Sequence, residues 1–457
     1  MRVYKRETER LKRAENLIGE KFPRFGVNKN REIVRLIYEI SKREDIPSEA
    51  VLPADCPLAF GRLKEYLLKR RFPESSAGSG SLRSYLPGFS LDLENCLQPR
   101  PGPFRPRRIF VEESARNSDL AGAFRAAFPR AEYSEIPTLK HFLAGRKYGG
   151  IPEYNKRTET AFIVSEEFDF FKRCPCTPRA VPCGYHIFNL SFGCIYECAY
   201  CYLQEYANVP GIIFPANIEK FLERFASYRN LPSSRSFQRG PFLRLGTGEF
   251  SDSLMLDDLT GYSIPLVEFF SRQDGVIFEF KTKSANIENL LRLDPAGKIV
   301  IAWSLNPQKI IDDNELYTAN LSERLDAARR VAEAGYGLAF HFDPVFYFRG
   351  WEDEYRGVIE SLFSLIDPER IAWISLGTLR FKPSLKKIIE SRFPANQILD
   401  AEMVLGYDNK LRYPAPIRSR IYRFLIDELE KHHRALPLYL CMEERSLWRE
   451  LKLPFPF

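Results

Sequence analysis

Two kinds of apolar stretch alternate along the middle of the chain, and this alternation constrains the fold more than any other feature. From Arg108 to Arg392, short runs typical of buried strands are followed by longer runs with apolar residues at helical spacing. Such alternation predicts parallel β/α units that close wholly or partly into a barrel. The predicted strands cover Arg108–Glu112, Tyr185–Leu190, Phe242–Leu245, Val276–Lys281, Ile299–Leu305, Leu338–Phe342 and Ile371–Leu376.

The segments on either side of this alternation have a different character. Helical spacing recurs in Thr8–Phe22, Asn30–Arg43 and Leu58–Lys69, and Gly, Pro and Ser then accumulate. Two short β-like runs around Tyr407-Asp-Asn-Lys410 predict a hairpin, and a helix is expected over Pro416–His432. Because 457 residues are many for one domain, we expect four parts. They are a helical N-terminal extension (1–72), a linker-like segment (73–106), the partial β/α barrel (107–395) and a small C-terminal hairpin and helix module (396–457).

Three cysteines, Cys194, Cys198 and Cys201, follow the strand expected at 185–190 with the spacing C-x3-C-x2-C. Three thiolates so close together can hold three irons of a cubane cluster and leave the fourth iron without a protein ligand. That iron is open to a substrate or a cofactor. A structural zinc site and a chance cluster are the alternatives, but zinc sites usually add a second ligand pair further along the chain, and the sequence has no such pair.

Composition narrows the setting of this chemistry. The formal charge of +7 and the pI near 8.8 permit a nucleic-acid partner without requiring one. The first ten residues are charged and lack the apolar run of a signal peptide, and no segment approaches the ~18 apolar residues of a membrane span. Nine cysteines in such a chain indicate metal or redox chemistry rather than disulfides. We therefore expect a cytoplasmic protein with no membrane partner and an oxygen-sensitive metal centre.

A series of short motifs links the chain to a known family. In order they are Asn189-Leu-Ser-Phe-Gly-Cys194, Cys201-Tyr-Leu-Gln204, Phe250-Ser-Asp252, Leu259-Thr-Gly261, Thr282-Lys283, Trp303-Ser-Leu-Asn306, His341-Phe-Asp-Pro344, Gly350-Trp-Glu352 and Leu379-Arg-Phe-Lys382. With the cysteine spacing, these motifs resemble the spore photoproduct lyase family of radical S-adenosylmethionine (SAM) enzymes. The resemblance runs from about Arg107 to about Pro394, and it implies a partial β/α barrel of the radical SAM type.

The resemblance also implies an activity. In radical SAM enzymes a 4Fe–4S cluster binds SAM, and one electron from an external reductant, flavodoxin- or ferredoxin-like, cleaves SAM to methionine and a 5′-deoxyadenosyl radical. The family enzyme uses that radical to take a hydrogen from a crosslinked thymine dimer in DNA, which then fragments to two thymines. The expected activity is therefore repair of a pyrimidine photolesion by a carbon–carbon lyase. The alternatives are a radical SAM enzyme acting on a peptide or small molecule, and a metal-stabilised nucleic-acid-binding protein without catalysis.

Residue by residue, the resemblance assigns the cluster to Cys194, Cys198 and Cys201. The implied SAM contacts are Glu249, Ser251 and Asp252 for the amino group, Lys283 and Ser304 for the carboxylate, and Asn306 and Asp343 for the ribose or adenine. Gly246-Thr-Gly-Glu249 also looks like the Gly-Gly-Glu element of these enzymes, where glycines let the backbone approach the ligand and a carboxylate suits an ammonium. An ordinary polar loop residue is the alternative for each position.

The resemblance breaks at Glu249, because the family carries there the cysteine that returns a hydrogen atom to the product radical. A carboxylate cannot donate a hydrogen atom as a thiol does. Tyr200 and Tyr202 match tyrosines of the family's radical relay and are the implied catalytic residues. Tyr202 and Cys441 are the candidate donors.

A second cysteine group, Cys174, Cys176 and Cys183, has the spacing C-x-C-x6-C just before the strand that leads to the cluster loop. It could form a second metal site, or its members could be buried structural thiols. A strand near 185–190 puts Cys183 roughly 20 Å from the cluster end. That separation disfavours a donor role and a shared cluster.

Basic residues near the end of the barrel suggest where DNA would bind. Arg380 and Lys382 match basic family positions near the DNA, and Lys410 and Arg412 lie in the expected hairpin at 401–413. Lys and Arg neutralise phosphates, and a lesion must leave the base stack before a buried radical can reach it. The hairpin could therefore wedge or grip a duplex. A solvated basic face is the alternative.

Overall fold

The computed structural model describes residues 2–54, 59–76, 95–98, 100–165, 171–206, 208–229 and 242–456. Contacts group the chain into two units. The helical unit comprises Met1–Pro99, Phe346–Trp351 and Thr378–Tyr422, and the barrel unit comprises Arg100–Val345, Glu352–Gly377 and Arg423–Phe457. The four domains expected from the sequence remain a prediction. Much of the expected linker, residues 77–94, lies outside the described residues.

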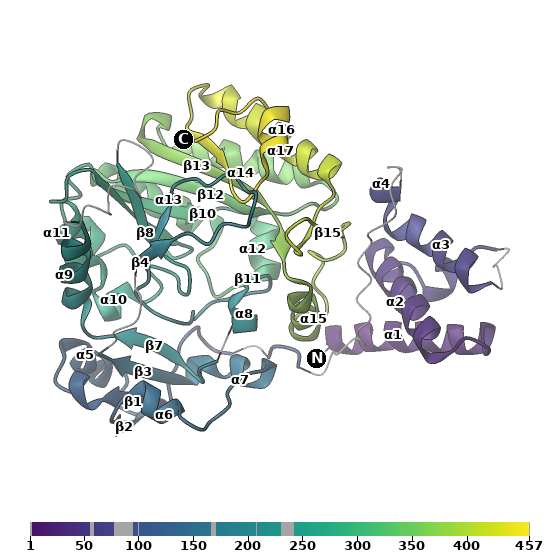
Figure 1. The fold of residues 1–457 in the computed structure, drawn as a ribbon, viewed down its shortest axis with the longest axis horizontal. Helices are drawn as coiled ribbons and strands as arrows, with labels where there is room; N and C mark the ends of the chain where they lie inside the picture. Colours follow the sequence, from purple (N-terminus) through teal and green to yellow (C-terminus); the bar gives the residue numbers. More distant parts are fainter. Residues whose placement is uncertain are drawn as a thin grey trace. The chain divides into compact units, whose positions relative to one another are not determined.

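Eight strands of the described chain form the curled sheet of the barrel unit, in the order β17-β13-β12-β10-β9-β8-β5-β4. Their bounds are β4 (Phe171–Arg173), β5 (His186–Phe188), β8 (Leu243–Thr247), β9 (Val276–Thr282), β10 (Ile299–Ser304), β12 (Gly337–Val345), β13 (Ile371–Thr378) and β17 (Leu438–Leu440). The strands from β5 to β12 pair in parallel, as β13 does with β17, and β4 alone is seen to pair antiparallel, with β5. The predicted partial β/α barrel is confirmed (Figure 1).

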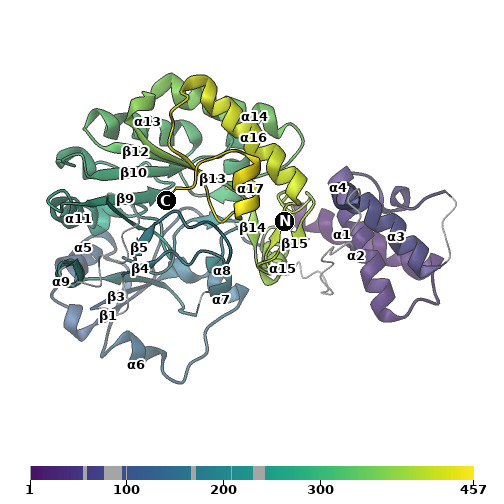
Figure 2. The same cartoon turned by 45° about the horizontal axis from the view of Figure 1, so that its top comes forward.

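Helices line the outer side of this sheet, where Figure 2 shows α11 (Ser263–Phe270), α13 (Leu321–Glu333) and α14 (Trp351–Leu365). The start of α13 is fixed locally, because Asn320 and Glu323 form a capping box. Every residue of β10 is buried, since helices cover one face of the sheet and the barrel interior the other. This packing leaves the carboxyl ends of the strands to carry polar side chains.

Two runs with apolar residues at helical spacing, Leu259–Ser271 and Ile287–Leu293, predict helices that differ from the structure. The run Leu259–Ser271 breaks at Gly261, whose φ of 60° is left-handed, and α11 restarts where the Asp257 carboxylate accepts hydrogen bonds from Ser263. The run Ile287–Leu293 forms only a 3₁₀ turn at Leu290–Arg292. It is too short for stable α-helix, and Asp294-Pro295 follows it directly.

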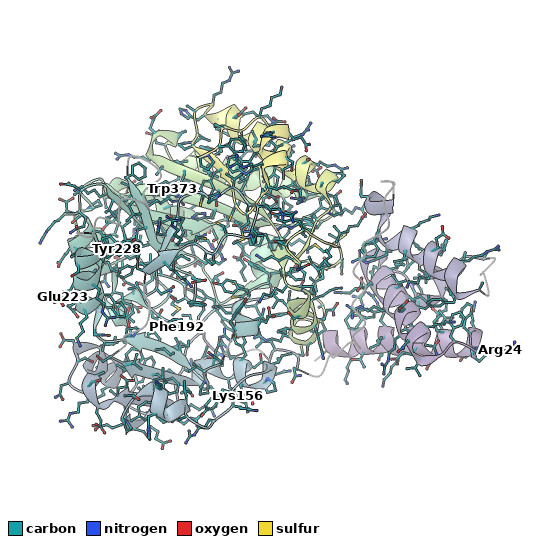
Figure 3. The ribbon with its side chains drawn as sticks, in the orientation of Figure 1. Arg24, Lys156, Phe192, Glu223, Tyr228 and Trp373 are labelled. Carbon is teal, nitrogen blue, oxygen red and sulfur yellow. The ribbon has the colours of Figure 1, made fainter. Side chains whose placement is uncertain are left out.

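A second, four-stranded parallel sheet belongs to the same unit, in the order β2-β1-β3-β7. It contains β1 (Arg108–Glu112), β2 (Glu132–Ile136), β3 (Thr160–Val164) and β7 (Ile212–Pro215). The strand expected at 108–112 therefore exists but pairs outside the barrel. A bridge between Phe192 (labelled in Figure 3) and Ile213, with N–O distances of 3.2 and 2.9 Å, joins the chain after β5 to β7. The cysteine loop thus leaves from the junction of the two sheets.

The helical unit contains the three N-terminal helices α1 (Arg2–Lys21), α2 (Val27–Glu44) and α3 (Phe60–Arg71), packed around one apolar cluster. The predictions of helices in these regions are confirmed. The unit also contains β14 (Arg380–Phe381), α15 (Pro383–Arg392), β15 (Val404–Leu405) and β16 (Leu411–Arg412). β15 and β16 pair antiparallel, so the predicted hairpin is confirmed as well.

A buried carboxylate ties the N-terminal helices to α15 within the helical unit. Glu39 accepts from Arg35 at 2.7 Å, Arg71 at 2.8 Å and Lys386 at 2.8 Å. Burial alone would raise the pKa of Glu39, but the three cations lower it well below its ordinary value. Glu39 and Lys386, which are 347 positions apart in the sequence, are therefore held together by an ion cluster. None of the helices in the described ranges is long and apolar enough to cross a bilayer.

Candidate active site

The three cysteines of the C-x3-C-x2-C motif line one cavity of about 220 Å³ at the carboxyl ends of β8, β9 and β10. Nine of the residues expected from the sequence line this cavity: Cys194, Cys198, Cys201, Tyr202, Glu249, Ser251, Asp252, Lys283 and Ser304. Tyr200, Asn306 and Asp343 are not among its lining residues. Lys281 lines it too and was not anticipated, although it lies in β9 two residues before Lys283, which directly follows the strand.

Two arginines that precede the motif in the sequence, Arg100 and Arg157, hold the cysteine loop in place. Arg157 donates to the carbonyl of Cys194 at 2.9 Å and to the carboxylate of Glu197 at 2.8 Å. Arg100 donates to the same Glu197 oxygen at 2.7 Å. Glu197 is fully buried and thus balances two cations. Neither arginine was predicted, because both are distant in sequence and have no local motif.

Gln204, the last residue of the Cys-Tyr-Leu-Gln motif, fixes the other end of the loop. Its side-chain amide donates to the carbonyls of Ala199 at 2.7 Å and Cys201 at 3.0 Å. Gln204 and Ala199 are both buried, so no solvent molecule can replace the Gln204 amide as the donor to the Ala199 carbonyl. The motif therefore contributes a backbone clamp as well as a cysteine.

The donor set fits an iron–sulfur cluster better than a single ion. Among the described residues, no three His, Cys, Asp or Glu side chains converge on one point as a lone metal ion needs. A cubane does not need such convergence, because each thiolate binds a different iron. Burial raises the pKa of all three thiols, for Cys194 to about 12, so a metal must displace their protons. Three thiols on one cavity fit a cluster with one open iron.

Glu249 already holds an ammonium group. The Nζ atom of Lys172, on β4, lies 2.5 Å from the Glu249 Oε2 atom. The approach is not aligned as a hydrogen bond, and Oε2 has no hydrogen-bond partner among the described residues. The carboxylate therefore suits a primary ammonium and keeps bonding capacity for one. Lys172 was missed because β4 carries no motif.

The two glycines before Glu249 act differently from each other. A Cβ at Gly246 would lie 2.5 Å from both the carbonyl oxygen of Glu279 and the hydroxyl of Tyr185. Gly246 is thus needed for strand packing, and the expectation that it approaches the ligand is not met. Gly248 lines the cavity with a φ of 97°, which favours glycine.

Asp252 organises the cavity wall. One of its oxygens accepts from the Leu254 amide at 3.0 Å and the Thr282 hydroxyl at 2.7 Å, and the other accepts from the Lys283 amide at 2.7 Å. Burial raises its pKa despite these hydrogen bonds. The carboxylate therefore joins the loop after β8 to the end of β9.

Lys283 places a second charge in the cavity. Burial opposes its charge, but Glu315 and Cys198 raise its pKa above the ordinary value. Burial also raises the pKa of Glu315, and the charges of Arg324 and Lys283 outweigh it and lower that pKa to about 2. The Tyr200 hydroxyl donates a hydrogen bond to the Glu315 carboxylate, and the Lys283 ammonium lies 5.8 Å from the Tyr200 ring centre. Tyr200 thus supports Lys283 from outside the cavity.

Asn306 and Asp343, which the resemblance assigns to the ribose or adenine of SAM, do not line the cavity. Asn306 is fully buried, donates to Glu315 at 2.9 Å and accepts from the Tyr355 hydroxyl at 2.8 Å. Both ends of its amide are thereby used within the protein, which is the arrangement of a structural residue. Asp343 lies in β12 and is half-buried. Tyr202, in contrast, is 40% exposed at the cavity and donates to the backbone carbonyl of Glu249.

Cys174 does not line this cavity, but its thiol interacts electrostatically with Lys281 and Glu249, which do line it. Cys174 follows β4, and its amide donates to the Tyr185 carbonyl at 3.0 Å. Strand alternation puts Cys174 on the same face as Lys172, whose ammonium reaches Glu249. A hydrogen bond with Cys176, followed by burial, raises the pKa of the Cys174 thiol. Cys174 was overlooked because the sequence-based prediction considered only the distance from Cys183 to the cluster loop.

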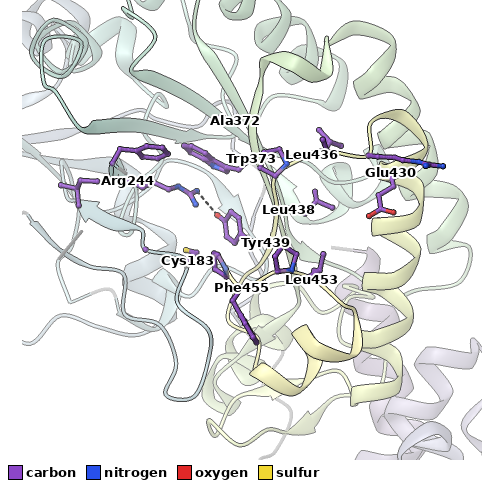
Figure 4. Close-up of a pocket in the computed structure, with 18 residues that line it drawn as sticks. Cys183, Arg244, Ala372, Trp373, Glu430, Leu436, Leu438, Tyr439, Leu453 and Phe455 are labelled. Atoms are coloured by element: carbon purple, nitrogen blue, oxygen red, sulfur yellow. Dashed lines mark hydrogen bonds between the residues drawn. The ribbon is translucent and has the colours of Figure 1, made fainter. Parts of the chain in front are cut away.

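Cys183 and Cys441 have other surroundings. Cys183 lines a separate cavity of about 510 Å³ with Arg244 and Tyr439, whose hydroxyl accepts from Arg244 at 2.9 Å (Figure 4). Cys441 follows β17, where its amide donates to the Leu376 carbonyl at 2.8 Å. Cys174, Cys176 and Cys183 do not converge on one point as a single metal ion would need.

The four basic residues expected near DNA belong to the helical unit. Arg412 is buried, with its side chain 2.6 Å from the Asp408 carboxylate and stacked 5.0 Å from the Tyr407 ring centre. That is the environment of a structural ion pair and not of a phosphate contact. Lys382 is exposed, and Arg380 and Lys410 are half-buried.

The sequence and the fold both match known proteins. A model of the family described as spore photoproduct lyase matches residues 164–407. Spore photoproduct lyase from Bacillus subtilis (strain 168) is 28% identical over 310 residues, 66% of this chain and 86% of that protein. The enzyme of the same name from Geobacillus sp. (strain Y412MC61) is 26% identical over 307 residues, 65% of this chain and 85% of that protein.

Solved structures extend the comparison of the fold. A spore photoproduct lyase complexed with dinucleoside spore photoproduct superposes with a TM-score of 0.60 at 23% identity. A double mutant of spore photoproduct lyase with bound AdoMet and dinucleoside spore photoproduct gives a TM-score of 0.62 at 23% identity. Each covers 74% of this chain and 99% of the other chain.

Proposed function

This chain belongs to the spore photoproduct lyase family, and on that premise we propose that it is a radical SAM enzyme that repairs a pyrimidine photolesion in DNA. One observation carries the proposal: a single cavity gathers three thiols, the Glu249 carboxylate and the Lys283 ammonium. These are the groups that a 4Fe–4S cluster and the two charged ends of an amino acid require.

The residues divide the binding work by charge. Cys194, Cys198 and Cys201 would hold three irons of the cluster. Glu249 would take the ammonium of SAM, as it takes that of Lys172 here, and Lys283 would take the carboxylate. Together the cluster and SAM supply a 5′-deoxyadenosyl radical when an external one-electron reductant of the flavodoxin or ferredoxin type is present.

The rest of the cavity positions these groups. Asp252 fixes the backbone at Lys283, and Gln204 and Arg157 fix the cysteine loop. Because these contacts are buried, the thiols and the charged side chains keep their places before any ligand arrives. We propose Ser251 and Ser304 as further SAM contacts, since both line the same cavity.

We assign the hydrogen donor for the product radical to Cys174. Its S–H bond breaks as a C–H bond forms on the product, which leaves a radical on sulfur. Burial and the hydrogen bond with Cys176 keep the thiol protonated, as donation requires. Tyr202 then returns a hydrogen atom to the sulfur, its O–H bond breaking as the S–H bond forms again. The external reductant restores Tyr202 with one electron and one proton from water.

The test is an anaerobic turnover experiment. The protein is reconstituted with iron and sulfide, reduced, and given SAM with DNA that carries the spore-type thymine dimer. Release of thymine together with 5′-deoxyadenosine is the expected result. Deoxyadenosine without thymine would contradict repair of this lesion and point to a different substrate, such as a peptide or small molecule.

The donor has its own test in the same assay. Cys174→Ser is expected to keep forming deoxyadenosine while thymine release falls sharply, because the hydroxyl O–H bond is too strong to donate its hydrogen. Cys441→Ala is the matched control and should keep the ratio of thymine to deoxyadenosine. In D2O, the wild type should place solvent deuterium in thymine. An unchanged ratio in Cys174→Ser would move the donor to Tyr202 or Cys441.

A further inference from the structure

The net positive charge of the chain is confined to its N-terminal helices. Of the 67 Lys and Arg and 60 Asp and Glu residues, residues 1–72 contain 18 and 11. The remaining 385 residues contain 49 of each sign and are neutral overall. The formal charge of +7 therefore belongs to the part of the chain that precedes the matched family region.

Part of this charge is gathered on one end of the three-helix body. Five exposed basic residues lie at the end of α1, in the turn after it, and in the first turns of α2 and α3: Lys21, Arg24, Lys29, Arg31 and Arg62. We call this surface the helical tip, and Figure 3 shows Arg24 at the end of the body formed by α1, α2 and α3. Over the described residues, none of the five forms an ion pair, whereas buried Arg35 and Arg71 are neutralised by Glu39.

Two aromatic rings form the floor of the helical tip. Phe25 and Phe60 meet edge to face at 5.6 Å, and the ammonium of Lys29 lies 5.3 Å from the Phe60 ring centre. Val27 beside them is 66% exposed. The contact between Lys29 and Phe60 shows that the starts of α2 and α3 are neighbours. The basic side chains of the helical tip therefore surround an apolar surface formed by Phe25 and Phe60.

The backbone adds to the positive potential of the helical tip. The residues before α2 and α3 are Gly26 and Ala59, and neither provides a side-chain cap. Neither helix has an acidic residue in its first turn, although both first turns are fully described. The first amide groups of both helices therefore keep their affinity for an anion.

We propose that the helical tip binds the sugar–phosphate backbone of duplex DNA, without regard to sequence or lesion. The inference rests on the proposed function: a basic surface can bind any polyanion, and an enzyme whose substrate is DNA is expected to use it for DNA. Phosphate contacts position a protein without reading bases, and they let it move along DNA by counterion exchange. Such a surface keeps the enzyme on DNA between rare lesions. An anionic membrane is the competing partner, and the test includes it.

The experiment compares two full-length triple variants with the same change in charge. Lys29→Glu, Arg31→Glu and Arg62→Glu alter the helical tip, and Arg130→Glu, Lys140→Glu and Lys147→Glu alter exposed positions of the barrel unit. Binding of an undamaged fluorescent duplex is measured between 50 and 200 mM salt. Three lost phosphate contacts lower the log–log salt slope by about 2.7, so the fourfold salt increase weakens the wild type about 40-fold more than the tip variant. The control variant should keep the wild-type slope.

Equal slopes in the two variants would overturn the proposal. Binding to vesicles of anionic phospholipid, lost in the tip variant while duplex binding persists, would overturn it in favour of a membrane. A second tip variant with Gln at the same three positions, checked by circular dichroism, excludes misfolding as the cause. Dinucleoside spore photoproduct separates the two proposals because it contains no duplex for the tip to bind. The tip variant should repair it at the wild-type rate, and its failure as a wild-type substrate would count against the proposed function alone.

Discussion

The Lys172 ammonium lies 2.5 Å from the Oε2 atom of Glu249, so the carboxylate of the cavity is matched to a primary amine before any ligand binds. The strand pairing of β4 with β5 holds Lys172 in this place. Glu249 is only 14% exposed, and a charge so poorly hydrated needs a cation beside it. An incoming amino group would therefore compete with the lysine for the negative charge of Glu249.

Substitution of the two partners should change SAM affinity in opposite directions. Glu249→Gln should weaken SAM binding about 10- to 100-fold, because a hydrogen bond to a charged group contributes about 1.5–3 kcal/mol. Lys172→Met should tighten binding, because it removes the competing ammonium. Equilibrium dialysis with reconstituted, oxidised protein measures both, with exposed Glu132→Gln as the control. Weaker binding in Lys172→Met would show that the lysine itself contacts SAM.

Each cysteine of the motif should be needed for the cluster. Ala at Cys194, Cys198 or Cys201 removes one of three iron ligands, so anaerobically reconstituted variants should lose the visible absorbance and the bound iron. Iron and sulfide analysis measures the loss. Cys174→Ala is the matched control, and it should keep the wild-type iron content. Loss of iron in that control would make Cys174 a ligand and remove it as the donor.

Gln204→Ala should destabilise the protein by about 1–3 kcal/mol, since it removes the side-chain donor to the carbonyl of buried Ala199. Urea unfolding followed by circular dichroism gives the free energy of unfolding. The exposed Gln397→Ala should stay within about 0.5 kcal/mol of the wild type. Equal stability of the two variants would mean that the clamp is dispensable.

His341 should make stability depend on pH. It is buried between Glu279 at 2.7 Å and Ser375, and burial, followed by the charge of Lys281, lowers its pKa to about 4. The unfolded chain, with a pKa near 6.5, binds the proton first, so stability falls as pH decreases from 6.5 towards 4. Between pH 7.5 and 5.5 the wild type should lose about 1 kcal/mol from this group. His341→Gln should lack this part of the pH dependence in urea unfolding, and an unchanged slope would exclude His341 as its source.

Two hairpin residues that look alike in the sequence should behave differently. Arg412→Ala should cost about 3–5 kcal/mol of folding free energy, because it strands the buried Asp408 carboxylate. Lys410→Ala should leave stability nearly unchanged and, if it contacts a phosphate, lower the salt slope of DNA binding by about 0.9. Thermal unfolding and fluorescence anisotropy measure the two effects. A stable Arg412→Ala with weakened DNA binding would contradict the structural role.

Part of the site could be read from the sequence because its signals are local. The cysteine spacing predicts three cluster ligands without any structure. The rule that parallel strands present their carboxyl ends together places Glu249, Lys283 and Ser304 in one cavity, and the structure bears out that convergence. The alternation of strand and helix likewise predicts the curled sheet, since burial on both faces forces each strand to be apolar.

What the sequence by itself determined about this protein is the class of its fold and the set of residues at its strand ends. Only the tertiary structure decided which of those residues face the cavity. It turned Asn306 into a partner of Tyr355, buried Arg412 against Asp408, and brought Lys172 beside Glu249. It also moved the strand at 108–112 into a second sheet. Strand periodicity records only whether a side chain is buried, whereas its partner is chosen by segments hundreds of residues away, whose pairing leaves no local pattern.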